Sequence, residues 1–572
     1  MKQTIPHIAL VVALVVVSLG GVVRQQTTEG GSKLPPEVKA ALQTITSEDL
    51  LQHIKILASD EFEGRTPGTK GEQLTVNYLV DKFKHFGLKA GNTDGTYIQK
   101  VPLVGITSES TASFAVGRKK IDLRSPDDYV VISPRFTPEV TVKDSDIVFV
   151  GYGIVAPEYG WDDYKGTVMS GKTLLMLSGE PDIQDPADPT KLDEKMFKGR
   201  AMTRYALGGY KSDLAAELGA AAVIIVHANK LGAYPYASLV GELSRERVYL
   251  KESEKNIKPV AASSFITVDG AKRLISAGGQ DLETLHRAAL SKDFRPVTLD
   301  VKASFHLKNR LREFESRNVI ALCDGSDANL RREYVIYTAH WDHLGRDEKL
   351  TGDQIFNGAV DNASGTAALL EIANAFMRLA PPPKRSILFL ATTAEEAGLL
   401  GAKYYTSRPL YPLSTTLADI NMDIFFPFGR SRDILSVSYG YSTLDEILSE
   451  AALTQGRTVK PDFFPQAGSF YRSDQFAFAQ AGVPVLYASS GLEIIGKPPG
   501  YALGKLLEWN SKYYHKVSDE VRPEWDLSGT VEDLKLLFTV GYRVAQADRY
   551  PEWKPAAEFK RRHEHNPVNR KK

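Results

Sequence analysis

The chain has 572 residues, and 70 lysines and arginines balance 70 aspartates and glutamates, so the formal net charge is zero. The composition, 43% hydrophobic and 24% charged residues, is globular and excludes a largely disordered chain. The neutral balance argues against a nucleic-acid-binding surface spread over the whole molecule. The single cysteine, Cys323, excludes an internal disulfide and a thiolate metal cluster, so any metal ligands must be histidines and carboxylates.

The N-terminal 24 residues have the pattern of a targeting segment. Lys2 precedes an uncharged apolar run from Ile8 to Val23, and Arg24 follows it. This order is typical of a secretory signal. The run is shorter than the roughly 20 apolar residues of a membrane span. We therefore predict a signal peptide or an uncleaved N-terminal anchor at 1–24, and an exported protein, periplasmic or extracellular, with no other membrane contact.

The length of the chain exceeds what one core usually supports, which predicts at least two domains. We expect a linker at 25–36 and a catalytic domain in two parts, 37–135 and 306–555. The first part is predicted to contain helices from Ser47 to Leu57 and from Gly71 to Phe86, because apolar residues recur there at helical spacing. A basic tail is expected at 556–572.

Residues 136–305 have a different pattern and are interpreted as an inserted, β-rich domain. Short apolar runs, separated by Gly, Pro and Asp clusters, predict strands at Ile147–Val150, Thr173–Leu177 and Ala222–Val226. One helix is predicted among them, at Lys211–Leu218. The sequence from Gly166 to Thr173 fits the phosphate-loop pattern, but the expected strand after it argues against a nucleotide site, which needs a helix there.

From Asn318 onward, predicted strands alternate with predicted helices, which indicates an α/β fold with a mostly parallel sheet. The strands are expected at Tyr334–Thr338, Ser386–Thr392, Leu417–Asp423 and Val483–Leu486. The helices are expected at Ser364–Leu379, Ala397–Ser407, Leu444–Gln455 and Ser473–Gln480.

Acidic residues and histidines gather just after these strands, at the sheet edge where α/β proteins bind ligands. His340 and Asp342 follow the first strand with the spacing that lets a carboxylate lie behind an imidazole. Asp361 precedes a helix, and the adjacent Glu395 and Glu396 follow the second strand. Taken singly, each has another explanation. His340 is typical of a histidine in the core and Asp361 of a helix N-cap, and the two glutamates are typical of acidic residues in the first turn of a helix.

Two further clusters complete the set. Asp423 ends the third strand, where a buried carboxylate needs a partner, and His515 lies in a polar loop near the C-terminus. Together the clusters supply two histidines, two aspartates and a glutamate as ligands, with a second glutamate and an aspartate to spare. This is about the inventory that two cations need when they share one carboxylate. Ligands without thiolates favour a catalytic over a structural zinc site.

In this order, the clusters resemble peptidase family M28, the co-catalytic zinc exopeptidases. The segment Asp60–Arg65 is similar to the family's N-terminal region, and Ser473–Pro484 to the segment before its last histidine. Residues 136–305, with Gly151-Tyr-Gly153 and Trp161–Tyr164, resemble a protease-associated domain. The resemblance implies a mostly parallel mixed sheet with helices on both faces, plus this inserted domain.

Carried over by position, the resemblance implies two zinc ions. His340 and Asp423 would hold one ion. Glu396 and His515 would hold the other, and Asp361 would bridge both. The stretch from Gly491 to Trp509 is long and rich in Gly, Pro and Leu, so it departs from the family's pattern where the substrate pocket is expected.

The resemblance further implies that Asp342 orients His340 and that Glu395 is the general base. Glu395 would take a proton from water shared by the metals and return it to the departing amine, and Tyr471 could donate to the oxyanion. The expected function is an exported dizinc aminopeptidase acting on peptides. A carboxypeptidase or dipeptidase using the same site, and a single-zinc acyltransferase like glutaminyl cyclases, are the alternatives.

Overall fold

The computed structural model describes residues 34–227, 235–252 and 258–561. The predicted signal or anchor segment, and the tail beyond residue 561, lie outside the described residues. Within the described ranges, no helix combines the length and the apolar character needed to cross a bilayer.

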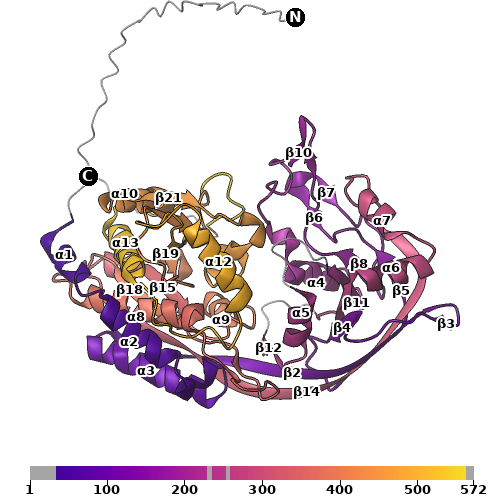
Figure 1. Ribbon diagram of the computed structural model, residues 1–572, viewed down its shortest axis with the longest axis horizontal. Coiled ribbons are helices and arrows are strands. Elements are labelled where there is room, and N and C mark those ends of the chain that lie inside the picture. The colour runs from indigo at the N-terminus through magenta and orange to yellow at the C-terminus, as the bar shows by residue number, and fades with distance from the viewer. Residues whose placement is uncertain (1–33, 228–234, 253–257, 562–572) are drawn as a thin grey trace, which may run out of the picture. The chain divides into compact units, whose positions relative to one another are not determined.

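The C-terminal half is built on a mixed, mostly parallel sheet, which confirms the predicted fold class (Figure 1). Its central strands are parallel in the order β18, β15, β19, β22, and the end of β14 adds an antiparallel neighbour to β18. The bounds of this group are β14 Val297–Cys323, β15 Tyr334–His340, β18 Ser386–Thr392, β19 Thr416–Asn421, β20 Asp433–Ser436, β21 Thr458–Pro461 and β22 Val485–Ser490.

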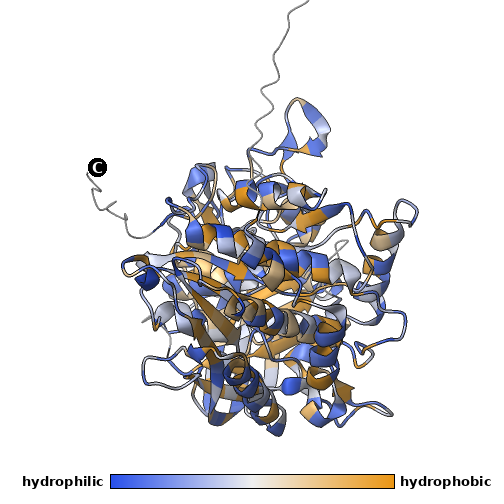
Figure 2. Cartoon of the chain, turned by 90° about the vertical axis from the view of Figure 1, so that its left-hand side faces the viewer, coloured by the Kyte–Doolittle hydropathy of each residue, from blue (hydrophilic) through white to orange (hydrophobic). Residues whose placement is uncertain are grey.

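Alternate residues of the central strands pack against helices on the two faces of the sheet. On one face, Tyr337 stacks on Phe389 and lies 5.8 Å from Phe376 of α8, which in turn lies 4.3 Å from Phe538 of α13. On the other face, Ile336 belongs to an apolar cluster with residues of α9 and α11. Figure 2 shows the corresponding hydrophobic colour along the strands. Three N-terminal helices also contact or flank this half, namely α1 Pro36–Leu42, α2 Ser47–Leu57 and α3 Lys70–Phe86. Its own helices are α8 Ser364–Met377, α9 Leu400–Ser407, α10 Leu444–Thr454, α11 Gln475–Gln480, α12 Tyr501–Lys512 and α13 Ser528–Gln546.

A long antiparallel ribbon joins the two sets of strands. β2 (Ile98–Val116) pairs with β14 from Val319 back to Lys302, and β14 also pairs with β18 at one end and with β5 (Glu139–Phe149) at the other. One continuous strand therefore belongs to both the C-terminal sheet and the inserted region.

The inserted region contains more helix than the sequence predicted. Its strands β5, β8, β11 and β13 are parallel, and β4, which precedes residue 136, is antiparallel at the edge. In the described part of this region, four helices lie among the strands instead of one. The bounds are β4 Tyr129–Ile132, β8 Thr173–Leu177, α4 Gly208–Glu217, β11 Ala222–His227, α5 Tyr236–Leu243, β13 Ala262–Thr267, α6 Val268–Ala277 and α7 Leu282–Ala288. The domain boundaries at 136 and 305 stay a prediction.

Candidate metal centre

The candidate residues meet at one edge of the parallel sheet. His340 is the last residue of β15 and pairs with Thr392, the last residue of β18, while β19 lies on the other side of β15. Glu395 and Asp423 come three and two residues after β18 and β19. Because parallel strands end at the same edge, the three side chains converge.

The carboxylate of Asp361 lies between two imidazoles. Its Oδ1 is 3.5 Å from His340 Nε2, and its Oδ2 is 3.3 Å from His515 Nε2. On the first side, His340 Nε2 is 3.3 Å from Asp423 Oδ1. On the second side, His515 Nε2 is 3.1 Å from Glu396 Oε2. Each imidazole thus lies within 3.5 Å of two carboxylates, and Asp361 is common to both. The ligand atoms of His340, Asp361 and Glu396, and those of His340, Glu395 and Asp423, also lie within 4.8 Å of one another.

These spacings are those expected between the ligands of a zinc ion. Ligand atoms that lie about 2.0–2.1 Å from a tetrahedral zinc ion are roughly 3.3 Å from one another. The observed distances of 3.1 to 3.5 Å match that value on both sides of Asp361. Three of the five residues, His340, Asp361 and Asp423, are at least 94% buried, since their exposed fractions are 1%, 3% and 6%. The donor set, imidazole and carboxylate, is one that zinc accepts in catalytic sites.

The electrostatics of the centre favour added positive charge. Burial acts to lower the pKa of His340, but Glu395 and Asp423 raise it well above its usual value. Burial also acts to lower the pKa of His515, but Glu396 and Asp361 outweigh it and raise this pKa to about 10. The carboxylates therefore stabilise cations at both imidazoles, and that charge can be supplied by protons or by metal ions.

Glu395 differs from Asp361 and Glu396, whose pKa values are lowered, against the effect of burial, by the imidazoles beside them. Burial raises its pKa well above the usual value, and Glu396 and Asp423 raise it further, although His340 opposes them. Its Oε2 lies 3.9 Å from His340 Nε2, and its side chain lines a cleft beside Asp423 and His515. A carboxyl group with raised proton affinity at this place is suited to accept and return a proton.

Asp342 contacts the centre in a different way from the one expected. The main-chain oxygen of Asp342, rather than its carboxylate, lies within 3.1 Å of His340 Nδ1, while the carboxylate stands 3.8 Å away. Its Oδ1 accepts a hydrogen bond from the backbone N–H of Glu395 at 3.0 Å, and its Oδ2 accepts one from Glu396 at 3.3 Å. The side chain of Asp342 therefore fixes the turn that carries the two glutamates.

Two residues near the predicted ligands support the centre in ways that the sequence analysis missed. His343 Nδ1 lies 2.7 Å from Glu396 Oε1, and Asp519 accepts hydrogen bonds from the backbone N–H groups of Val360 and Asp361 at 3.1 and 3.0 Å. Both belong to motifs visible in the sequence, but their partners lie 53 and 158 residues away. Only the fold shows which ligand each of them positions.

Arg65 connects the loops that carry the ligands. Its side chain is 1% exposed and donates four hydrogen bonds of 2.6–2.9 Å, all to main-chain carbonyl groups. The acceptors are Trp341, beside His340, then Asn357 and Gly358 before Asp361, and Leu57 at the end of α2. Arg65 thus links the loop that follows His340 to the loop that precedes Asp361.

The hydroxyl group of Tyr471 bonds to a residue outside the candidate metal centre. Its hydroxyl donates to Glu558 Oε1 at 2.5 Å. Because a phenol has one proton to donate, this hydrogen bond argues against the oxyanion role suggested by the sequence.

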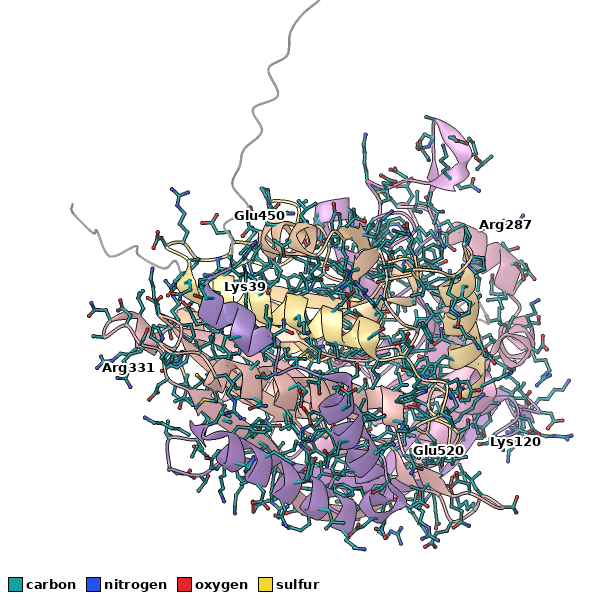
Figure 3. All side chains as sticks on the ribbon, turned by 60° about the vertical axis from the view of Figure 1, so that its left-hand side comes forward. Lys39, Lys120, Arg287, Arg331, Glu450 and Glu520 are labelled. Atoms are coloured by element: carbon teal, nitrogen blue, oxygen red, sulfur yellow. The ribbon has the colours of Figure 1, made fainter. Side chains whose placement is uncertain are left out.

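Replacing Arg65 by Met should destabilise the protein by at least about 3 kcal/mol, because four buried carbonyl groups lose their donor. The affinity for zinc should fall as well, because the loops of His340 and Asp361 are no longer joined. Urea unfolding measures the first effect, and competition with a chromophoric chelator measures the second. Arg331→Met is the control, since Arg331 is half-exposed at the surface (Figure 3) and its loss should change stability by less than about 0.5 kcal/mol. Equal stabilities for the two variants would contradict the role given to Arg65.

Residues 318–539 match the model of peptidase family M28. Aminopeptidase NAALADL1 of Mus musculus is 39% identical over 134 residues, which make up 23% of this chain and 16% of that protein. The probable leucine aminopeptidase 2 of Aspergillus oryzae is 24% identical over 370 residues, 64% of this chain and 56% of that protein. The matched stretches therefore span less than two thirds of either relative.

Among solved structures, an aminopeptidase from Aneurinibacillus sp. strain AM-1 aligns with 92% of this chain and 100% of its own length, at 18% identity and a TM-score of 0.47. The family match itself contains every candidate ligand, from His340 to His515. The part of this chain that carries both imidazoles and all the candidate carboxylates is therefore the part that matches peptidase family M28.

Proposed function

We propose that the protein is a dizinc exopeptidase that removes residues from the N-terminus of peptides. The observation that carries the proposal is the carboxylate of Asp361, which lies 3.5 and 3.3 Å from the two imidazoles. A carboxylate shared in this way is what two neighbouring cations need. The family match of residues 318–539 and the two relatives named above, which are aminopeptidases, support the same activity.

In this proposal, His340 and Asp423 would hold one zinc ion, Glu396 and His515 would hold the other, and Asp361 would hold both. When bound, the zinc ions supply Lewis acidity toward the scissile carbonyl and toward water. The carboxylate of Glu395 takes the proton that water loses and delivers it to the nitrogen of the departing amine. Asp342 keeps Glu395 and Glu396 in place through their backbone N–H groups.

The cleft over the centre has room for a peptide. Its volume is about 2700 Å³, whereas pockets for small ligands have volumes of about 300–1,000 Å³. Residues of the M28 domain, including Glu395 and His515, line it together with residues of the inserted region, including Phe136 and Tyr249. We propose that the inserted region is a protease-associated domain that borders the substrate, and that the protein is exported by means of residues 1–24.

Replacing Glu395 by Gln should lower kcat by several orders of magnitude, because the amide cannot take up the proton. About two zinc ions per chain should remain, since Glu395 is not among the proposed ligands. Elemental analysis measures the metal and a chromogenic aminoacyl substrate measures the turnover. Glu315→Gln removes an exposed carboxylate and should leave both values unchanged. Near-normal turnover by the Glu395 variant would rule out its role as base.

Blocking the substrate should distinguish the two ends of a peptide. We expect N-acetylation of a dipeptide to abolish hydrolysis and C-amidation to leave it largely intact, because the proposed enzyme acts at a free N-terminus. A chelator should abolish both reactions, and added zinc should restore the second. The opposite pattern would identify a carboxypeptidase, and a zinc content of one per chain would favour the single-zinc acyltransferase.

A further inference from the structure

A short loop of the inserted region lies against the C-terminal half of the chain. The backbone N–H of Met202 donates a hydrogen bond to the carbonyl oxygen of Pro465 at 3.0 Å. On either side of Met202, the side chains of Lys198 and Arg204 both lie near one carboxylate of the C-terminal half, that of Glu558. We call these two ion pairs, Lys198 and Arg204 with Glu558, the latch.

The carboxylate of Glu558 has three partners, and only 12% of its side chain is exposed. Its Oε1 accepts a hydrogen bond from the hydroxyl of Tyr471 at 2.5 Å and lies 3.4 Å from Lys198 Nζ. Its Oε2 lies 3.8 Å from Arg204 Nε. Lys198 also donates to the hydroxyl of Tyr441 at 3.2 Å, with its ammonium 4.7 Å from the centre of that ring. Such a network stabilises more than an isolated ion pair at the surface does.

The latch can open without leaving a buried charge alone. Arg204 lies 3.9 Å from Glu158, which belongs to the inserted region and would move with it. Glu558 would keep the hydroxyl of Tyr471, which belongs to the C-terminal half. The side chain of Lys198 is 31% exposed, so water can solvate its ammonium. Breaking an ion pair is most costly where one partner stays buried and unpaired, and the latch avoids that cost.

The other attachment of the inserted region is of a different kind. The strands β2 and β14 run without a break from the C-terminal sheet into the inserted region, and β12 (Arg247–Leu250) pairs with β2. Two ion pairs flank β12, namely Arg245 with Asp347 at 3.1 Å and Arg408 with Glu252 at 2.7 Å. Continuous backbone and strand pairing hold this attachment, so it can serve as a hinge when the latch opens.

The latch borders the cleft over the candidate metal centre. Arg204 and Tyr471 line this cleft together with Glu395 and His515. With the latch closed, the volume of the cleft is about 2700 Å³. A substrate held within that volume is a short peptide, because a long chain or a folded protein does not fit. Release of the inserted region would widen the cleft beside Arg204.

We propose that the latch limits the length of the substrate, so that the latched protein hydrolyses short peptides and opening of the latch admits longer ones. This inference rests on the proposed peptidase function and adds the size class of the substrate to it. Glu558 is a positioning residue in this account, because it acts through the inserted region and does not touch the scissile bond.

The test variant is Glu558→Gln. It removes the charge that attracts Lys198 and Arg204, but its amide oxygen can still accept the hydrogen bond from Tyr471. The matched control is Glu552→Gln, which changes an exposed glutamate of the same C-terminal segment. The control should behave as the wild type does in both of the following measurements.

The first measurement is the distance between the inserted region and the C-terminal half. Spin labels are attached to Glu283→Cys on α7 and Leu453→Cys on α10, two exposed positions. The native Cys323 is buried and does not compete for the label. Double electron–electron resonance should show longer and broader distances in Glu558→Gln than in the chain that keeps Glu558. An unchanged distance distribution would overturn the latch.

The second measurement compares kcat/KM for peptides of three and ten residues with the same N-terminal residue, using the zinc-loaded protein. The ratio of the long to the short peptide should rise by at least about threefold in Glu558→Gln. A general loss of structure would lower both values and would not raise this ratio. Salt at about 1 M should raise the ratio in the wild type but not in the variant, because it screens ion pairs.

The two measurements separate the latch from the peptidase function. Longer distances in Glu558→Gln with an unchanged ratio would show a hinge that does not select length, and would overturn the proposal while the peptidase function stands. Failure of the wild type to cleave either peptide would instead overturn the peptidase function, and the length limit with it.

Discussion

The structure depends on one constraint, which is the burial of several carboxylates at a single point. Asp361, Glu395, Glu396 and Asp423 converge at the end of a parallel sheet, where at most 11% of each side chain is exposed. Buried carboxylates of this number cannot all stay charged without cations. The imidazoles of His340 and His515 compensate part of this negative charge when they are protonated. The carboxylates raise the pKa values of both imidazoles, so the centre favours positive charge.

A second group of buried polar side chains holds this centre together without belonging to the proposed ligands. Asp342, Asp519 and Arg65 each bond to main-chain groups beside a ligand. Asn362 acts in the same way, because its amide donates to Met422 and its Oδ1 accepts from Ile424, on both sides of Asp423. Side-chain bonds to the backbone restrict whole loops, so they fix ligand geometry more firmly than contacts between flexible side chains would.

The strands and helices of the α/β half could be predicted because their apolar periodicity is strong. The expected strand Ser386–Thr392 and the observed β18 have the same bounds, and the candidate ligands were found at the ends of such strands. The sequence predicted that the carboxylate of Asp342 orients His340, whereas the main-chain oxygen of Asp342 contacts that imidazole. Residue spacing along a strand does not show which of the two groups meets the imidazole. The partner of His343 depends on a contact distant in sequence, which local patterns do not contain. The helix α6 of the inserted region does show local signals, because Thr267 caps it and Ala271, Leu274 and Ile275 are buried on one face.

The central claim is that five side chains from five segments bind two neighbouring metal ions through one shared carboxylate. The most direct test is an anomalous-difference map, at the zinc absorption edge, from crystals of the zinc-loaded protein. The account predicts two peaks roughly 3.5–4 Å apart, each in contact with one oxygen of Asp361. A single peak, or two peaks of which one does not touch Asp361, would contradict it.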